Sequence, residues 1–122
     1  VSLCSIEHFG LGRYGDDFDL DADKKAMKEM IRVLKPGGCL IISTTITKAV
    51  PSIVFNLYRA YSTEMIKDFF KNMEKVEEKY WAFNDDKIKG HVYAPGDFCD
   101  IDDITSIPGS WSLYLGCWKK PN

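Results

Sequence analysis

The residues best suited to chemistry stand together near the start of the chain, in the run Ser5-Ile6-Glu7-His8. Histidine and glutamate often serve as proton acceptors or hydrogen-bond anchors in active sites. The run follows a short apolar stretch typical of a buried strand, and ligands of open α/β sheets bind at the carboxyl ends of strands. Glu7 and His8 are therefore candidate catalytic residues. A structural reading stays open, in which Glu7 caps or pairs locally and His8 is a satisfied structural residue.

Four further side chains could line a pocket for an anionic or polar substrate. They are Arg13, Tyr14, Arg59 and Tyr61. The alternative is equally ordinary, because surface cations often lie over aromatic bodies packed beneath them.

Two familiar ligand motifs fail in the segment that follows His8. Gly10 to Gly15 spells G-x-G-x-x-G, but the dinucleotide fingerprint needs a helix that opens inside the motif. Here five aspartates follow between positions 16 and 23, and they would repel a pyrophosphate. An EF-hand reading fails too, since Ala22 and Lys28 occupy the positions that require glycine and glutamate. An acidic loop that caps the next helix is the better interpretation.

Cysteine and histidine spacing predicts no metal site. Cys4-x-x-x-His8 supplies only two ligands, and no Cys-x-x-Cys pair is present. The widely spaced thiols fit a reducing, cytosol-like compartment.

The elements that must position the candidates follow from the hydrophobic pattern. We expect strands at 1–6, 39–46, 75–83 and 111–118, helices at 22–35 and 63–73, and a long acidic loop at 84–109. Met27, Met30, Ile31 and Leu34 form the apolar face of the first helix, and Ser62 or Thr63 caps the second. A buried strand, a helix and an apolar strand without alternation are typical of a βαβ unit in a parallel sheet.

Composition limits the partners. The 122 residues are 45% hydrophobic and 28% charged, which suits one packed domain. A net charge of −2 gives no global field that would attract nucleic acid or an anionic membrane. No apolar run approaches the length of a membrane span.

The order of these motifs resembles one known family. Ser-Ile-Glu-His after a strand, a helix that ends Met-Ile-Arg-Val-Leu-Lys-Pro-Gly-Gly, and then Cys-Leu-Ile-Ile-Ser are similar to the second half of a class I S-adenosylmethionine-dependent methyltransferase. The stretch Ile6-Glu7-His8-Phe9-Gly10-Leu11-Gly12-Arg13-Tyr14-Gly15-Asp16 resembles an uncharacterised methyltransferase-like family, a domain of unknown function with nematode and bacterial members.

The resemblance implies a fold and a site. The fold would be α/β, the C-terminal part of a Rossmann-like methyltransferase sheet: strands four to seven with two helices, mostly parallel, with an antiparallel last strand. Cys4, Ser5 and Ile6 would lie under S-adenosylmethionine, Glu7 and His8 would face the methyl-transfer cleft, and the loop from Phe9 would border a small-molecule or glycan-like acceptor.

The family's glycine-rich cofactor loop and ribose-binding acid have no counterpart here. We therefore expect residues 1–122 to be part of a larger domain whose N-terminal half is missing, and we expect this chain alone to bind the cofactor poorly. The alternative is a non-catalytic, degenerate methyltransferase fold that acts in protein interaction or scaffolding.

Overall fold

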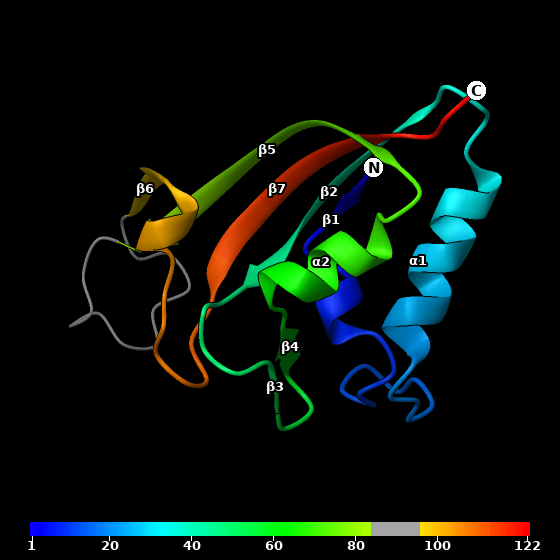
Figure 1. Ribbon diagram of the computed structural model, residues 1–122. Helices are drawn as coiled ribbons and strands as arrows, with labels where there is room; N and C mark the ends of the chain where they lie inside the picture. The colour runs from blue at the N-terminus through cyan, green and yellow to red at the C-terminus, as the bar shows by residue number, and fades with distance from the viewer. Residues whose placement is uncertain (84–95) are drawn as a thin grey trace.

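A computed structural model describes residues 1–83 and 96–122 of the chain, in which a five-stranded sheet packs against two helices (Figure 1). The elements are β1 (Ser2–Leu3), the 3-10 helix η1 (Ile6–His8), α1 (Ala22–Val33), β2 (Cys39–Ile46), β3 (Ser52–Val54), β4 (Tyr58–Ala60), α2 (Thr63–Phe69), β5 (Glu74–Phe83), β6 (Gly96–Cys99), the 3-10 helix η2 (Ile101–Asp103) and β7 (Ser112–Lys119).

The sheet corrects the predicted fold class. Its strand order is β1-β2-β7-β5-β6, and among the described strands only β1 and β2 pair in parallel. The last strand, β7, lies between β2 and β5 and is antiparallel to both, and β6 is antiparallel to β5. The prediction of a mostly parallel, Rossmann-like sheet is therefore wrong, and the sheet is mixed. An apolar run such as β2 shows that a strand is covered, but it does not reveal the direction of its neighbours.

Local signals placed the helices well. The helix expected at 22–35 forms Ala22–Val33, and the turn at Pro36 and Gly37 follows it. The Ser62 hydroxyl caps α2 by accepting a hydrogen bond from the Met65 backbone N–H at 3.2 Å.

The core lies between one face of the sheet and the two helices. Ile42 of β2 and Tyr114 of β7 face Met27 of α1 and Phe70, the residue that ends α2. The Phe70 ring stacks on the Trp118 indole at 4.6 Å. This packing fixes α1 beside the sheet, and with it the loop that precedes α1 beside η1, where β1 ends.

Glycine lets one aromatic side chain cross this face. Tyr114 leans over Gly116, so that its hydroxyl accepts a hydrogen bond from Trp118 Nε1 at 2.9 Å and donates one to Glu78 at 3.1 Å. A Cβ atom at Gly116 would lie 2.4 Å from the tyrosine oxygen. Burial raises the pKa of Tyr114, which keeps this hydroxyl protonated as a donor.

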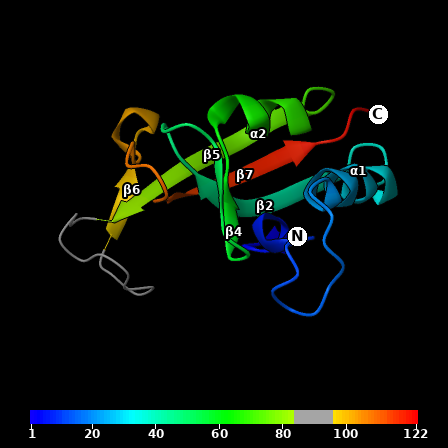
Figure 2. The same cartoon turned by 90° about the horizontal axis from the view of Figure 1, so that it is seen from below.

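A hairpin that the sequence did not reveal joins the sheet to the candidate site. Strands β3 and β4 pair around a turn in which Phe55 has a φ of 48°. Figure 2 shows β4 standing in front of the sheet, near the N-terminus and η1. Residues 84–95 of the predicted acidic loop lie outside the described residues, and β6 and η2 form within the rest of it.

Neither helix of the described residues combines the length and apolar character needed to cross a membrane. The same residues hold no group of three or more histidine, cysteine, aspartate or glutamate side chains that could bind a metal ion.

Candidate functional site

A cavity of about 710 Å³ opens where β1 ends and η1 begins, within the volume range of small-molecule sites. The loop between η1 and α1 forms its other wall. The residues that line it are Cys4, Ser5, His8, Phe9, Gly10, Tyr14, Asp16, Asp17, Asp19 and Ala22. All of them come from the first 22 residues, so one short stretch of chain builds the cavity.

The structure brings together half of the predicted site residues at this cavity. These are Cys4, Ser5, His8, Phe9 and Tyr14. Cys4 adopts a φ of 49°, and its backbone N–H donates to the Ser43 carbonyl at 2.9 Å, which turns the chain out of the sheet. The turn directs the following residues into η1 and toward the cavity.

The other predicted residues lie elsewhere. Ile6 is fully buried in the core, Tyr61 is buried as well, and Arg13 is exposed. Arg59 is 5% exposed. Glu7 is buried directly behind His8 and does not line the cavity.

The His8 ring is held in a defined orientation. Its Nδ1 lies 2.5 Å from the backbone carbonyl oxygen of Leu57, in the turn between β3 and β4. A carbonyl oxygen only accepts hydrogen bonds, so Nδ1 carries the hydrogen. In the neutral ring Nε2 then has a free lone pair, and Nε2 lies 3.7 Å from Glu7 Oε1. The Tyr14 ring meets the His8 ring edge to face at 6.1 Å.

The carboxyl group of Glu7 is removed from water. Burial raises its pKa above the usual 4.5, although hydrogen bonds from its own backbone N–H and from Thr44, and the charge of His8, oppose that rise. The Thr44 hydroxyl donates to Glu7 Oε2 at 2.9 Å. Glu7 can therefore hold a proton at a higher pH than an exposed glutamate, beside the nitrogen of His8 that is free to accept one.

Aspartates shape the outer wall of the cavity. Asp16 accepts hydrogen bonds from the backbone N–H groups of Gly10 and Tyr14, and such donors, its own N–H foremost, lower its pKa. The side chain of Asp19 is occupied by Lys25 Nζ at 2.7 Å, which likewise lowers its pKa. Asp17 is exposed and bonds to none of the described residues. It is the carboxylate of this wall that is free for a ligand.

The structure gives Gly10, the first glycine of the G-x-G-x-x-G motif, a structural role that does not involve phosphate binding. It has a φ of 74°, and its carbonyl accepts a hydrogen bond from the Asp19 backbone N–H at 2.8 Å. A Cβ atom there would lie 2.1 Å from the Asp19 carbonyl oxygen. The glycine thus allows the acidic loop to fold back across the end of η1.

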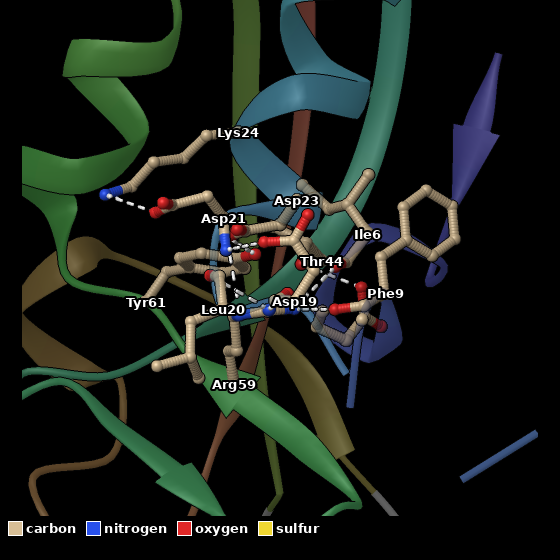
Figure 3. Close-up of polar contacts among 12 residues, drawn as sticks. Ile6, Phe9, Asp19, Leu20, Asp21, Asp23, Lys24, Thr44, Arg59 and Tyr61 are labelled. Atoms are coloured by element: carbon tan, nitrogen blue, oxygen red, sulfur yellow. Dashed lines mark hydrogen bonds and ion pairs between the residues drawn. The ribbon is translucent and has the colours of Figure 1, made fainter. Parts of the chain in front are cut away.

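Arg59 ties this loop to the fold from beneath (Figure 3). Its guanidinium donates to four carbonyl oxygens, at Ile6, Phe9, Asp19 and Leu20, over 2.5–3.5 Å. Its Nε lies 3.6 Å from Asp23 Oδ2. The Tyr61 hydroxyl donates to the same oxygen at 2.7 Å, and burial raises the pKa of Tyr61. These two residues, predicted as substrate contacts, hold the walls of the cavity in place.

The sequence pattern did not single out the aspartates or Asp23 as parts of the site. An acidic loop before a helix is fully explained by helix capping, and the pattern carried no sign that the loop folds back over η1. The available signal of a tightly folded loop was the three glycines at positions 10, 12 and 15, all of which have a positive φ in the structure.

Comparisons with known proteins find two similarities. A family model described as "Caenorhabditis protein of unknown function, DUF268" matches residues 1–90. A demethylmenaquinone methyltransferase from Staphylococcus aureus is 30% identical over an alignment of 105 residues, and the match covers 80% of this chain. The chain spans 43% of the length of that relative.

Proposed function

The chain belongs to the DUF268 family, and from that premise we propose that it forms the methyl-acceptor side of an S-adenosylmethionine-dependent methyltransferase. The similarity to a curated methyltransferase supports the reaction type. The observation that carries the proposal is the cavity, whose lining includes His8, with a free ring nitrogen, and the carboxylate of Asp17, which bonds to none of the described residues.

The groups that line the cavity suit this cofactor. S-adenosylmethionine carries a sulfonium cation, an ammonium group and ribose hydroxyls, which call for negative charge and hydrogen-bond acceptors. The cavity offers the Asp17 carboxylate and His8 Nε2, and the Ser5 hydroxyl has lone pairs left because it donates to the Leu3 carbonyl at 3.0 Å. No lysine or arginine is among the described residues that line it, and this lining disfavours an anion.

The roles of the residues follow from their positions. When bound, the cofactor supplies an electrophilic methyl group on a sulfonium sulfur. His8 Nε2 takes the proton of the acceptor's attacking group, and the Leu57 carbonyl keeps the ring oriented for that transfer. Glu7 supports the protonated ring from 3.7 Å. Cys4 and Ser5 border the cofactor, and Phe9 and Tyr14 shield the reacting groups from water.

The same lining favours an acceptor rich in donors and without negative charge. Hydroxyl groups meet this requirement, and the cationic cofactor would repel a second cation. A small hydroxylated molecule, glycan-like in its polar groups, is therefore the proposed acceptor.

A titration followed by amide NMR tests the proposal. The 122-residue chain, labelled with nitrogen-15, is titrated with S-adenosylmethionine and, in parallel, with S-adenosylhomocysteine, which lacks the sulfonium charge. We expect shifts confined to amides of residues 4–19, with the sulfonium compound binding more tightly. Shifts that lie mainly elsewhere, or no shifts at millimolar cofactor, would refute the proposal.

A further inference from the structure

We propose that Cys39 and Cys117 bind one Cu(I) ion between their sulfur atoms, on the face of the sheet that the two helices leave open. Strands β2 and β7 run side by side in Figure 1, and each contributes one of the two cysteines. All four cysteines of the chain are free, so both thiols are available. The site is separate from the cavity, because Cys39 begins β2 whereas the cavity opens where β1 ends.

Strand alternation places the two cysteines on the same face. Leu40 of β2 lies in the core, so its neighbour Cys39 points to the opposite face. Trp118 of β7 also lies in the core, and its neighbour Cys117 points away from it in the same way. Cys39 is exposed and Cys117 is half-buried, so an ion can reach both from solvent. The spacing of cysteines in the sequence does not reveal this pair, because it forms only when β7 pairs with β2.

The register of the ladder decides how far apart the two cysteines are. Cys39 lies opposite Lys119, and Ile41 lies opposite Cys117. The two cysteines are therefore diagonal neighbours. Such neighbours lie about 7–8 Å apart, beyond the roughly 4.4–6.8 Å between Cα atoms that a disulfide usually spans. A direct disulfide would be strained, whereas two sulfur atoms with one ion between them bridge a longer gap.

The two thiols nevertheless reach each other across this diagonal. Burial raises the pKa of the Cys117 thiol, and the Cys39 thiol raises it further through its charge and a hydrogen bond. Glu77 of β5, opposite Cys117, adds a smaller rise of the same sign. Release of the Cys117 proton therefore needs a ligand that binds the thiolate strongly, and a metal ion shared by two thiolates does so.

The number and kind of ligands select the ion. Soft thiolates favour Cu(I), zinc and iron–sulfur clusters. Zinc and iron–sulfur sites call for about four ligands, and the part of the chain that the structure describes holds no group of three or more metal-binding side chains. Cu(I) is stable with two thiolates in a linear arrangement. The complex is an anion, and Lys119, opposite Cys39, brings a positive charge beside it.

Competition with a coloured chelator tests the proposal on the reduced 122-residue chain. Cu(I) is supplied without oxygen as its bicinchoninate complex, and the fading of the colour measures transfer of copper to the protein. We expect one Cu(I) per chain, with two sulfur neighbours in X-ray absorption at the copper edge. Amide shifts should be confined to residues near positions 39–41 and 117–119.

Single substitutions assign the ligands. Cys39→Ser and Cys117→Ser each leave one thiol of the pair, and we expect each variant to lose its copper to the chelator. Cys99→Ser is the matched control, because Cys99 lies on β6, and this variant should take up copper as the unaltered chain does. Cys39 is exposed, so its replacement leaves the core intact, and an unchanged amide spectrum of the metal-free variant verifies this.

Three results would overturn the proposal: equal copper uptake by all three variants, amide shifts centred on Cys4 in the cavity, or a disulfide between Cys39 and Cys117 in place of copper uptake. None of these results bears on the methyltransferase proposal, because the cavity lining includes neither Cys39 nor Cys117.

Discussion

At the scale of single residues, Glu7 and His8 form a coupled pair whose environment is set by burial. His8 has one ring nitrogen fixed by a backbone carbonyl and the other left free. Glu7 is almost completely buried, and Thr44 is its hydrogen-bond donor from β2. The pair therefore combines a proton acceptor at the cavity with a carboxyl group behind it whose pKa is raised by burial.

The raised pKa of Glu7 makes a prediction about stability. The unfolded chain releases this proton near pH 4.5, whereas the folded chain keeps it to a higher pH. Between those two values the folded state binds more protons, so the free energy of unfolding falls as pH rises through the window. Glu7→Gln keeps an acceptor for Thr44 and removes the ionisation. We expect urea denaturation from pH 4 to 8 to show a smaller fall for this variant.

Glu64→Gln is the matched control, because Glu64 is exposed on α2. If both variants reduce the fall equally, the burial of Glu7 is not its cause.

The position of the candidate pair in the sequence was predictable, and the network that supports it was not. Polar residues after a short apolar stretch indicated Glu7 and His8, and the structure places His8 at the cavity. Arg59 and Tyr61 were selected by type alone. Their burial depends on Asp23, which lies opposite both of them. Asp23 is 36 positions from Arg59 and 38 positions from Tyr61 in the sequence, and no local pattern reveals contacts over such separations.

At the scale of elements, the ends of helices and strands hold the site in register. Lys120, just after β7, donates from Nζ to the carbonyl oxygens of Ile31 and Leu34 at 3.0 Å, at the C-terminal end of α1. The positive charge is favourable there because it meets the negative end of the helix dipole. The far end of α1 carries Asp23, so this contact also fixes one wall of the site.

Replacement of Lys120 tests that link. Lys120→Met keeps the apolar stem and removes the charge-assisted hydrogen bonds, and we expect unfolding to become easier by about 1–2 kcal/mol in urea denaturation. Lys119→Met, at the end of β7, is the comparison. Equal losses in the two variants would show that charge at the chain end, and not the contact with α1, provides the stability.

Local signals predicted elements better than their pairing. Caps, breakers and apolar periodicity located both helices and the long strands. The hairpin was missed because its turn contains Phe55 in a left-handed conformation, where glycine or asparagine is the usual signal. The prediction of a mostly parallel sheet was wrong because β7 inserts between β2 and β5 and is antiparallel to both. The place of β7 in the sheet depends on tertiary packing, which no local pattern reveals.

At the scale of the whole molecule, two features converge on one end of the sheet. The acceptor-rich cavity and the β3–β4 hairpin meet where His8 bonds to the Leu57 carbonyl, and Arg59 of β4 holds the loop before α1 from beneath. The remainder of the fold serves as a support: two helices on one sheet face bury the core and leave this end open.

The most direct test of the account is the affinity of the chain for S-adenosylmethionine when single aspartates are neutralised. Asp17 lines the cavity without a partner among the described residues, whereas Asp68 is exposed on α2 and lies outside the cavity lining. Asp17→Asn and Asp68→Asn change the net charge equally. The account predicts that only Asp17→Asn weakens binding severalfold at low ionic strength. Equal affinities for both variants and the unaltered chain would contradict it.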